Sequence, residues 1–364
     1  MKARGTWLVI AMAMLSSSAS GQTFKREELR VPAPGAGRQG LQVILVKPDL
    51  PGRLPLAVIT HGSPRKPEHR RTSSPLLYLP AAIEFARRGW AAAIVMRRGY
   101  GNSGGEYAES TGSCVSPDHT RSVAAAGSDL RASVAYLRKR SDIDGSRLIA
   151  IGQSTGGLMT IGLTANPPSG LVAAINFAGG QIPARAGEPC KGVEHRLVDA
   201  FKTFGKKSRV PTLWIYSDND KIFPPEIVEQ LKNAFSGGGG QVEYIKIPPF
   251  RDDGHSFFAR GVLQWTPHVD QFLKRSGLAL SENPLPVPQP IDTPTNLSEN
   301  GRKQFEEFFV TPPNRALAIS PTRGALGWHA GAGSLEHAKK AALAGCAKHA
   351  SDCRIVVVND EAVP

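Results

Sequence analysis

Two stretches of the chain place a serine between glycines in the spacing Gly-x-Ser-x-Gly, which can present a hydroxyl for nucleophilic attack. They are residues 152–156 (Gly-Gln-Ser-Thr-Gly) and 101–105 (Gly-Asn-Ser-Gly-Gly). The first follows an apolar run and precedes a helix-forming segment, whereas residues 106–116 after the second contain many Ser, Gly and Thr. Only a strand, a sharp turn and a helix push the hydroxyl out above a sheet. The context therefore favours Ser154 as the nucleophile and predicts a structural loop around Ser103.

A serine hydroxyl near its ordinary pKa is a weak nucleophile, so it needs a nearby general base that is itself oriented by a carboxylate. His255 follows the last predicted core strand, and Asp220 follows the strand before it. We therefore predict a catalytic set of Ser154, Asp220 and His255. Asp218 shares a loop with Asp220, and we favour Asp220 over it. His268, on the following helix, is the alternative base.

Attack on a carbonyl creates an oxyanion, which needs hydrogen-bond donors already in place. The backbone N–H of Thr155, at the start of the helix after the nucleophile, is one candidate. The backbone N–H of Ser63, in the sequence His-Gly-Ser-Pro that ends an early strand, is the other. We interpret His61 in that sequence as a residue that fixes the loop rather than one that carries a proton.

The elements that must position these residues alternate between strand and helix, which predicts a doubly wound, mostly parallel sheet. A turn is expected at residues 142–145. Loops that leave the carboxyl ends of parallel strands emerge at one edge, where such sheets carry their sites. Strands are predicted at residues 24–31, 41–47, 55–60, 91–96, 147–152, 171–177, 210–217 and 241–247, with helices at 80–89, 122–140, 154–165, from 223 to the four glycines at 237–240, and from His255 to 273.

The four cysteines are an even number, as expected for disulfides in an oxidising compartment. Cys114 and Cys190 lie in two loops on the predicted site edge, so we predict a disulfide that joins the two loops beside the site. Cys346 and Cys353 flank His349, which raises the possibility of a zinc site. A tetrahedral site needs four ligands and only three are at hand, so a second disulfide is favoured and no metal is expected.

The N-terminus resembles a secretory signal peptide over residues 1–20. Lys2 and Arg4 precede a largely apolar segment at residues 6–15, and small residues follow it. This segment is too short to span a membrane comfortably, and no later stretch is long enough. We therefore expect a periplasmic or secreted protein without a transmembrane segment once the signal is removed. An uncleaved membrane anchor is the alternative.

The net charge of +13 has three possible meanings: nucleic-acid binding, binding of anionic envelope polymers, or a solvated cationic surface. The basic residues occur as scattered pairs that build no single stripe, and no nucleic-acid motif accompanies them. We therefore favour a solvated surface and expect no nucleic-acid partner.

The organisation predicted after the signal is a catalytic domain at residues 22–277, a proline-rich linker with a short helix at 278–314, and a small C-terminal α+β module at 315–364. In the module, strands are expected at 316–319 and 354–358, with an alanine-rich helix at 335–348. The module resembles small cysteine-containing units at the ends of some exported bacterial proteins, and this resemblance implies no activity.

The motifs taken together resemble the α/β-hydrolase superfamily, in particular its dienelactone hydrolase-like and prolyl oligopeptidase-like branches. The matching parts are the strand into His-Gly-Ser-Pro at 61–64, the loop Arg-Gly-Tyr-Gly-Asn-Ser-Gly at 98–104, the Ser154 turn, the strand leading to Asp220, and Gly-His at 254–255. In these branches an Arg-Gly-x-Gly-x-Ser loop is structural, which also argues against Ser103. Typical dienelactone hydrolases use cysteine as the nucleophile, so the serine here favours general ester hydrolysis.

We therefore expect an exported serine hydrolase that cleaves small-molecule carboxylic esters through an acyl-enzyme on Ser154, without cofactor or metal. A prolyl oligopeptidase-like peptidase is the first alternative, although such enzymes usually carry a large N-terminal domain and little precedes the first strands here. The second alternative is a non-catalytic protein that uses the hydrolase scaffold and the basic tail to bind envelope polymers. Neither the physiological substrate nor the oligomeric state is apparent from the sequence.

Overall fold

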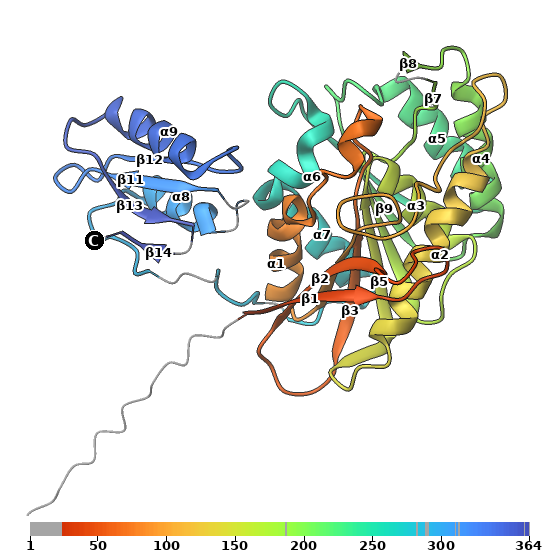
Figure 1. Cartoon of the computed structure of the whole chain (residues 1–364), viewed down its shortest axis with the longest axis horizontal. Helices are drawn as coiled ribbons and strands as arrows, with labels where there is room; N and C mark the ends of the chain where they lie inside the picture. The colour runs from red at the N-terminus through yellow and green to blue at the C-terminus, as the bar shows by residue number, and fades with distance from the viewer. Residues whose placement is uncertain are drawn as a thin grey trace, which may run out of the picture.

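The computed structural model describes residues 24–185, 188–281, 283–287, 291–309, 311, 314–359 and 361–363. They form a large α/β unit and a smaller C-terminal unit (Figure 1). The signal peptide expected at residues 1–20 lies outside the described residues. In the part of the chain that is described, no helix has the length and apolar character needed to cross a membrane.

The large unit is built on an eight-stranded sheet. Its strands are β1 (Phe24–Val31), β2 (Leu41–Pro48), β3 (Leu54–Thr60), β4 (Ala91–Val95), β5 (Ile143–Gln153), β6 (Leu171–Phe177), β9 (Thr212–Ser217) and β10 (Val242–Ile247). Their order in space is β1-β2-β4-β3-β5-β6-β9-β10. The pairs β1–β2 and β2–β4 are antiparallel and all other neighbours are parallel. This is the predicted doubly wound, mostly parallel sheet.

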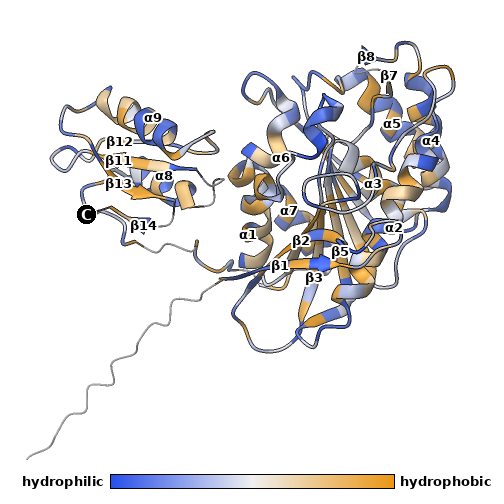
Figure 2. Cartoon of the chain, in the orientation of Figure 1, coloured by the Kyte–Doolittle hydropathy of each residue, from blue (hydrophilic) through white to orange (hydrophobic). Residues whose placement is uncertain are grey.

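Helices cover both faces of this sheet, which is why its central strands read as continuous apolar runs. Every residue of β3 and β4 is buried, and Figure 2 shows the apolar character of the central strands. Alternate residues of β3 pack into different cores: Leu56 and Val58 into one, Ala57 and Ile59 into the other. The first core is closed by α2 (His119–Leu137), α3 (Thr155–Thr164), α4 (Glu194–Lys207) and α5 (Pro225–Gly237), and the second by α1 (Leu79–Arg87), α6 (Phe257–Arg260) and α7 (Val262–Arg275).

Two parts of this unit differ from the prediction. Helix α4 was not predicted, although its buried Leu197, Phe201 and Phe204 follow helical spacing and face the sheet. The turn expected at residues 142–145 is wrong, because β5 already begins at Ile143. The pairing of β5 with β3 shifts between Pro55 and Leu56, so these turn-forming residues are accommodated as an irregularity within the strand.

The C-terminal unit is a four-stranded antiparallel sheet with a helix on each face. The elements are α8 (Glu299–Phe309), β11 (Ala316–Ile319), β12 (Leu326–His329), α9 (Leu335–Ala347), β13 (Arg354–Val358) and β14 (Glu361–Ala362), and the strand order is β12-β11-β13-β14. Alternate residues of β11 pack against the two helices. Leu317 and Ile319 share a core with the phenylalanines of α8, whereas Ala316 and Ala318 pack with the alanines of α9. Strands β12 and β14 were not predicted.

Candidate active site

Ser154 lies in a sharp turn between β5 and α3. Its backbone has φ 55° and ψ −124°, a conformation that a residue with a side chain adopts only at a cost. The flanking glycines are required sterically. A Cβ on Gly156 would lie 2.4 Å from the carbonyl oxygen of Thr60, and one on Gly152 would lie 2.2 Å from that of Gly156. The turn therefore has the strained geometry predicted for the Gly-x-Ser-x-Gly pattern.

His255 and Asp220 are hydrogen-bonded to each other. Nδ1 of His255 lies 3.1 and 3.0 Å from the two carboxylate oxygens of Asp220. Asp220 is 3% exposed, and its Oδ1 also accepts from the backbone N–H groups of Ile222 and Phe223. Because the carboxylate only accepts, Nδ1 carries the proton and Nε2 is left as the basic nitrogen.

The structure separates the two aspartates of the β9 loop. Asp218 pairs with Lys246 of β10 through contacts of 2.8 Å, and both side chains are substantially exposed. Asp220 instead lies buried beneath the histidine. His268, the alternative base, lies on α7 and is not among the described residues that line the pocket around Ser154.

Replacing each aspartate by asparagine is expected to give very different results. Asp220→Asn should lower kcat by about 10³- to 10⁴-fold, because the amide no longer holds the histidine in the tautomer that accepts from serine. Asp218→Asn removes only a surface ion pair, worth at most about 1 kcal/mol of stability. Steady-state kinetics on one ester substrate compares the two variants. A larger loss for Asp218→Asn would reassign the acid.

Ser154 and His255 line one pocket of about 210 Å³, together with Gly62 and Ser63 from the end of β3. The side chain of Gln153 ties this arrangement together: its Nε2 donates to the carbonyl oxygen of His255 at 2.7 Å. Gln153 was not singled out from the sequence. Its position beside the nucleophile was the only available signal, and its partner lies about a hundred residues away.

The loop after β3 approaches the nucleophile closely. A Cβ on Gly62 would lie 3.0 Å from that of Ser154. The N–H of Gly62 donates to the hydroxyl oxygen of Tyr78, at the end of η2 (Pro75–Tyr78), so the next N–H, that of Ser63, is the one at hand for an oxyanion. Thr155 begins α3, and N–H groups in the first turn of a helix lack intrahelical partners. Ser63 thus lines the same pocket as Ser154, and Thr155 follows Ser154 at the start of α3.

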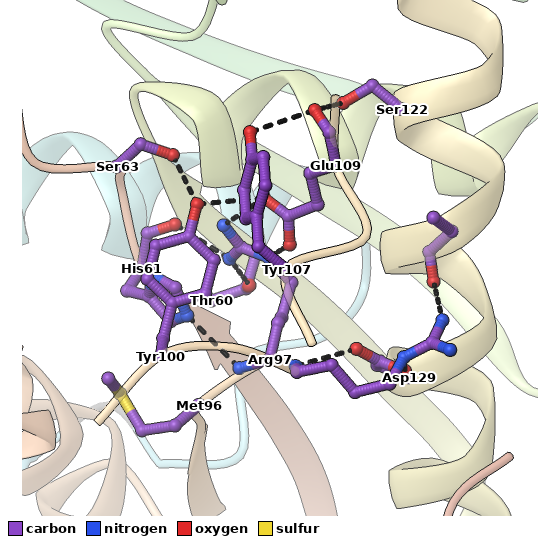
Figure 3. A network of polar contacts seen from close by, with 12 residues as sticks. Thr60, His61, Ser63, Met96, Arg97, Tyr100, Tyr107, Glu109, Ser122 and Asp129 are labelled. Atoms are coloured by element: carbon purple, nitrogen blue, oxygen red, sulfur yellow. Dashed lines mark hydrogen bonds and ion pairs between the residues drawn. The ribbon is translucent and has the colours of Figure 1, made fainter. Parts of the chain in front are cut away.

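A buried polar network supports this loop from below (Figure 3). Arg97 is fully buried and forms an ion pair with Glu109, which is 1% exposed. Arg97 also donates to the Thr60 hydroxyl at 2.5 Å. The Tyr100 hydroxyl donates to Glu109 at 3.2 Å and is hydrogen-bonded to the Ser63 hydroxyl at 2.7 Å. The network links the Ser63 loop to the loop after β4, a link the sequence did not reveal.

His61 fixes the loop through both ring nitrogens, in line with its predicted role. Nδ1 donates to the carbonyl oxygen of Gly62 at 2.8 Å, and Nε2 accepts from the backbone N–H of Arg97 at 3.1 Å. Burial lowers the pKa of His61 well below its ordinary value, and the nearby Arg97 guanidinium lowers the pKa further. The ring is therefore neutral and has no free nitrogen for proton transfer.

This neutral histidine predicts a pH-dependent stability. The unfolded chain binds a proton at His61 below about pH 6.5 whereas the folded chain does not, so stability is complete above that pH and falls as the pH drops. Protonation of His61 in the unfolded chain should lower the free energy of unfolding by about 1.4 kcal/mol between about pH 8 and about pH 5.5. Urea unfolding at about pH 8 and about pH 5.5 measures this loss.

The matched variant is His61→Gln, which should be less stable throughout but lose less than wild type between the two pH values. The variant should still lose some stability at low pH, because burial also lowers the pKa of His119. Carboxylates with lowered pKa values, such as Asp142, act only at more acidic pH. Equal losses in wild type and variant would contradict a neutral His61.

Ser103, in the second Gly-x-Ser-x-Gly stretch, is fully buried and structural. Its hydroxyl donates to the carbonyl oxygen of Met96 at 2.6 Å and accepts from the N–H of Gln42 at 2.8 Å. These contacts agree with the structural loop predicted around Ser103.

Both predicted disulfides are present. Cys114 pairs with Cys190, with Cα atoms 5.4 Å apart, and Cys346 pairs with Cys353 at 6.0 Å. The first joins the loop before α2 to the loop after β6, where a short hairpin of β7 (Ala184–Arg185) and β8 (Glu188–Pro189) also lies. Since the second pair is oxidised, it offers no thiolates for zinc. Within the described ranges, no group of three or more His, Cys, Asp or Glu residues could hold a metal ion.

The fold and the strained serine turn define the class of protein: an α/β-hydrolase. Residues 81–265, just over half of the chain, match the family described as the Dienelactone hydrolase family, and the matched segment contains Ser154, Asp220 and His255. The chain therefore belongs to the dienelactone hydrolase family. Comparison with curated proteins found no match.

Solved structures share the fold at low sequence identity. Thermogutta terrifontis esterase 2 phosphorylated by paraoxon is 19% identical, over 71% of this chain and 96% of that one, with a TM-score of 0.51. Pyrococcus furiosus esterase Pf2001 is 16% identical, over 70% and 90%, with a TM-score of 0.46. A Klebsiella pneumoniae protein described as a dienelactone hydrolase is 18% identical, over 70% and 99%, with a TM-score of 0.48. At such identities the likeness shows the fold alone.

Proposed function

We propose that this protein is an exported serine hydrolase that cleaves carboxylic esters through an acyl-enzyme on Ser154. One observation carries the proposal: Ser154, held in a strained turn, lines the same pocket as His255, whose Nδ1 is hydrogen-bonded to the buried Asp220. This arrangement supports the proposal because a nucleophile, a base and an orienting carboxylate are the three groups that acyl transfer by a serine requires.

In the proposed mechanism, Nε2 of His255 accepts the proton of the Ser154 hydroxyl as its oxygen attacks the ester carbonyl. Asp220 orients the ring and stabilises the imidazolium that forms. The backbone N–H groups of Ser63 and Thr155 bind the oxyanion of the tetrahedral intermediate. The imidazolium then protonates the leaving alcohol. Water, activated by the same histidine, hydrolyses the acyl-enzyme and restores Ser154.

Esters are the favoured substrates for two reasons. The nucleophile is serine, whereas the family's typical dienelactone hydrolases use cysteine at this position. The pocket around Ser154 has a volume of about 210 Å³, which suits small acyl or alcohol groups at the reacting bond. A dienelactone and a peptide are therefore the less favoured substrates.

Two features support export. Four cysteines are paired in two disulfides, Cys114–Cys190 and Cys346–Cys353, and such bonds persist mainly in oxidising compartments. The N-terminal sequence has the composition of a signal peptide. N-terminal sequencing of the protein recovered from outside the cytoplasm tests this, and an intact residue 1 would reject cleavage.

A substrate panel tests the activity. Short-chain nitrophenyl esters, prolyl peptide anilides and lactones should be compared on wild type and on Ser154→Ala. Turnover of esters that depends on Ser154 is expected, and faster turnover of the anilides would favour the peptidase instead. Paraoxon, which phosphorylates the esterase of T. terrifontis, should inactivate the wild type by phosphorylating Ser154.

A further inference from the structure

A cleft between the two units adjoins the pocket around Ser154. This cleft has a volume of about 500 Å³ and is lined by residues of η2, α6 and α7 on one side and by α8 and the end of β12 on the other. Ser74, just before η2, and Leu77, within η2, line both cavities. The two cavities therefore border each other at these residues, and a molecule bound at Ser154 would reach the cleft by passing over the exposed side chain of Leu77.

The C-terminal unit is held beside the large unit by its connecting segment. Leu285 pairs with Arg87 of α1, since the backbone N–H of Leu285 donates to the Arg87 carbonyl oxygen at 2.7 Å and the Arg87 side chain donates back at 2.6 Å. Leu278 and Leu280 pack against the core beneath α1 and α7. These contacts anchor the chain where it leaves the large unit, beside α1 (Figure 1).

The cleft exposes apolar and aromatic surface. Leu77 and Leu263 are 45% and 38% exposed, and both line the cleft. The C-terminal unit contributes the half-buried Trp328 and His329 from β12. Trp328 is braced edge-on by Phe308, with ring centroids 6.4 Å apart. These surfaces suit an apolar segment of a ligand.

The cleft also carries positive charge near the catalytic histidine. Arg251 and Arg260 both line it and are exposed. Arg251 lies four residues before His255, and the Asn219 side chain donates to its carbonyl oxygen at 2.8 Å, which fixes its backbone. Glu307 of α8 is the acidic residue of the lining. Burial raises the pKa of Glu307, although Arg251 opposes this. Two cations against one acid favour an anionic ligand group.

We propose that this cleft is a distal substrate site, which takes the far end of an ester bound at Ser154. An apolar segment of the substrate lies over Leu77 and Trp328, and an anionic terminus is bound by Arg251 and Arg260. The substrates are then amphiphilic esters with a negatively charged end, and the C-terminal unit completes their binding site. This inference rests on the proposed ester hydrolase activity.

The test compares matched esters with and without a terminal carboxylate. Monoethyl suberate and ethyl octanoate place the extension on the acyl side, and 8-acetoxyoctanoate and octyl acetate place it on the alcohol side. The measured quantity is the ratio of kcat/KM for the charged ester to that for its neutral partner, by pH-stat titration of the full chain. In wild type we expect a ratio above one for at least one pair.

Arg260→Glu reverses one exposed charge of the cleft and is expected to lower that ratio by about fivefold, as the loss and reversal of an exposed charge contact implies. Arg196→Glu is the matched control, because Arg196 is an exposed arginine of α4, on the other side of the large unit (Figure 1). It changes the net charge equally and should leave the ratio unchanged. Equal effects of the two variants would overturn the proposed site.

Trp328→Ala tests the apolar part of the site. It is expected to lower kcat/KM about threefold to tenfold for the extended ester of the preferred pair while ethyl acetate, which cannot reach the cleft, is turned over as in wild type. Thermal unfolding checks that the C-terminal unit still folds. If it does not, Arg260→Glu still decides the proposal. An unchanged kcat/KM in a folded Trp328→Ala variant would contradict it.

Ethyl acetate separates the two proposals. If wild type hydrolyses ethyl acetate but neither charged ester is preferred over its partner, the distal site is wrong and the ester hydrolase function stands. If wild type hydrolyses none of these esters, the proposed function itself fails, and the assignment of the cleft to substrate fails with it.

Discussion

Replacing Ser154 by alanine is expected to lower kcat for esters by about 10⁵- to 10⁶-fold, because no other group can form the acyl-enzyme. The residual rate reflects the oxyanion donors and substrate binding alone. His255→Ala should cost nearly as much, and the double variant little more than either, since the two residues act as one unit. Kinetics and labelling with a fluorophosphonate probe measure the loss.

Ser103→Ala is the matched control, since both serines lie in a Gly-x-Ser-x-Gly stretch. Removing its hydroxyl leaves the Met96 carbonyl and the Gln42 N–H without their buried partner, at a cost of about 1 to 3 kcal/mol of stability. Probe labelling at Ser154 should persist. Labelling that survives Ser154→Ala but is lost in Ser103→Ala would exchange the roles of the two serines.

Replacing Glu109 by alanine is expected to destabilise the fold by about 3 to 5 kcal/mol. The reason is that Arg97 is fully buried, and without Glu109 it becomes an uncompensated charge in the interior. Burial disfavours the charged guanidinium, but the pull of Glu109 outweighs this effect and raises the pKa of Arg97. A guanidinium keeps its proton in proteins even without an acidic partner, so the arginine stays charged when Glu109 is lost. Urea unfolding, with the slope checked for constancy, measures the loss.

Two further variants test whether the loss of stability comes from the burial of the Arg97 charge. Asp49→Ala breaks the exposed Lys25–Asp49 pair and should change stability by less than about 1 kcal/mol. Arg97→Met combined with Glu109→Leu removes both buried charges, and it should recover much of the stability that Glu109→Ala loses. A loss for Glu109→Ala as small as that for Asp49→Ala would mean that the Arg97 charge is solvated.

The same network would affect the proposed catalysis by positioning Ser63. Glu109 accepts from Tyr100, whose hydroxyl meets the side chain of Ser63, and the backbone N–H of Ser63 is a proposed oxyanion donor. Burial, followed by the charge of Glu109, raises the pKa of Tyr100 well above its ordinary value, so the phenol keeps its proton. The chain Arg97–Glu109–Tyr100–Ser63 thus couples the stability of the core to the geometry of the oxyanion site.

The sequence by itself determined the elements whose signals are local. A strand, a turn between glycines and a helix were recognisable around Ser154 because steric conflict excludes side chains at Gly152 and Gly156. Alternating strands and helices implied a doubly wound sheet, and that topology brings the loops of Asp220 and His255 to the edge that carries Ser154. The same reasoning paired Cys114 with Cys190.

Tertiary structure decided the contacts between residues far apart in the chain. Asp218 and Asp220 have the same chemistry two residues apart, but in the fold Asp218 pairs with Lys246 of β10 whereas Asp220 is hydrogen-bonded to His255. The bond from Gln153 to the carbonyl of His255 is equally long-range. Such contacts have no local pattern, because they depend on which loops the folded sheet brings together.

No local sequence pattern predicts the cleft between the two units. Its lining combines η2, the loop before His255 and β12. No spacing along the chain relates Leu77 to Trp328, and each alone reads as an ordinary apolar residue. The proposed catalytic residues thus stand in short sequence patterns, whereas the surface that would select a substrate exists only once both units are packed side by side.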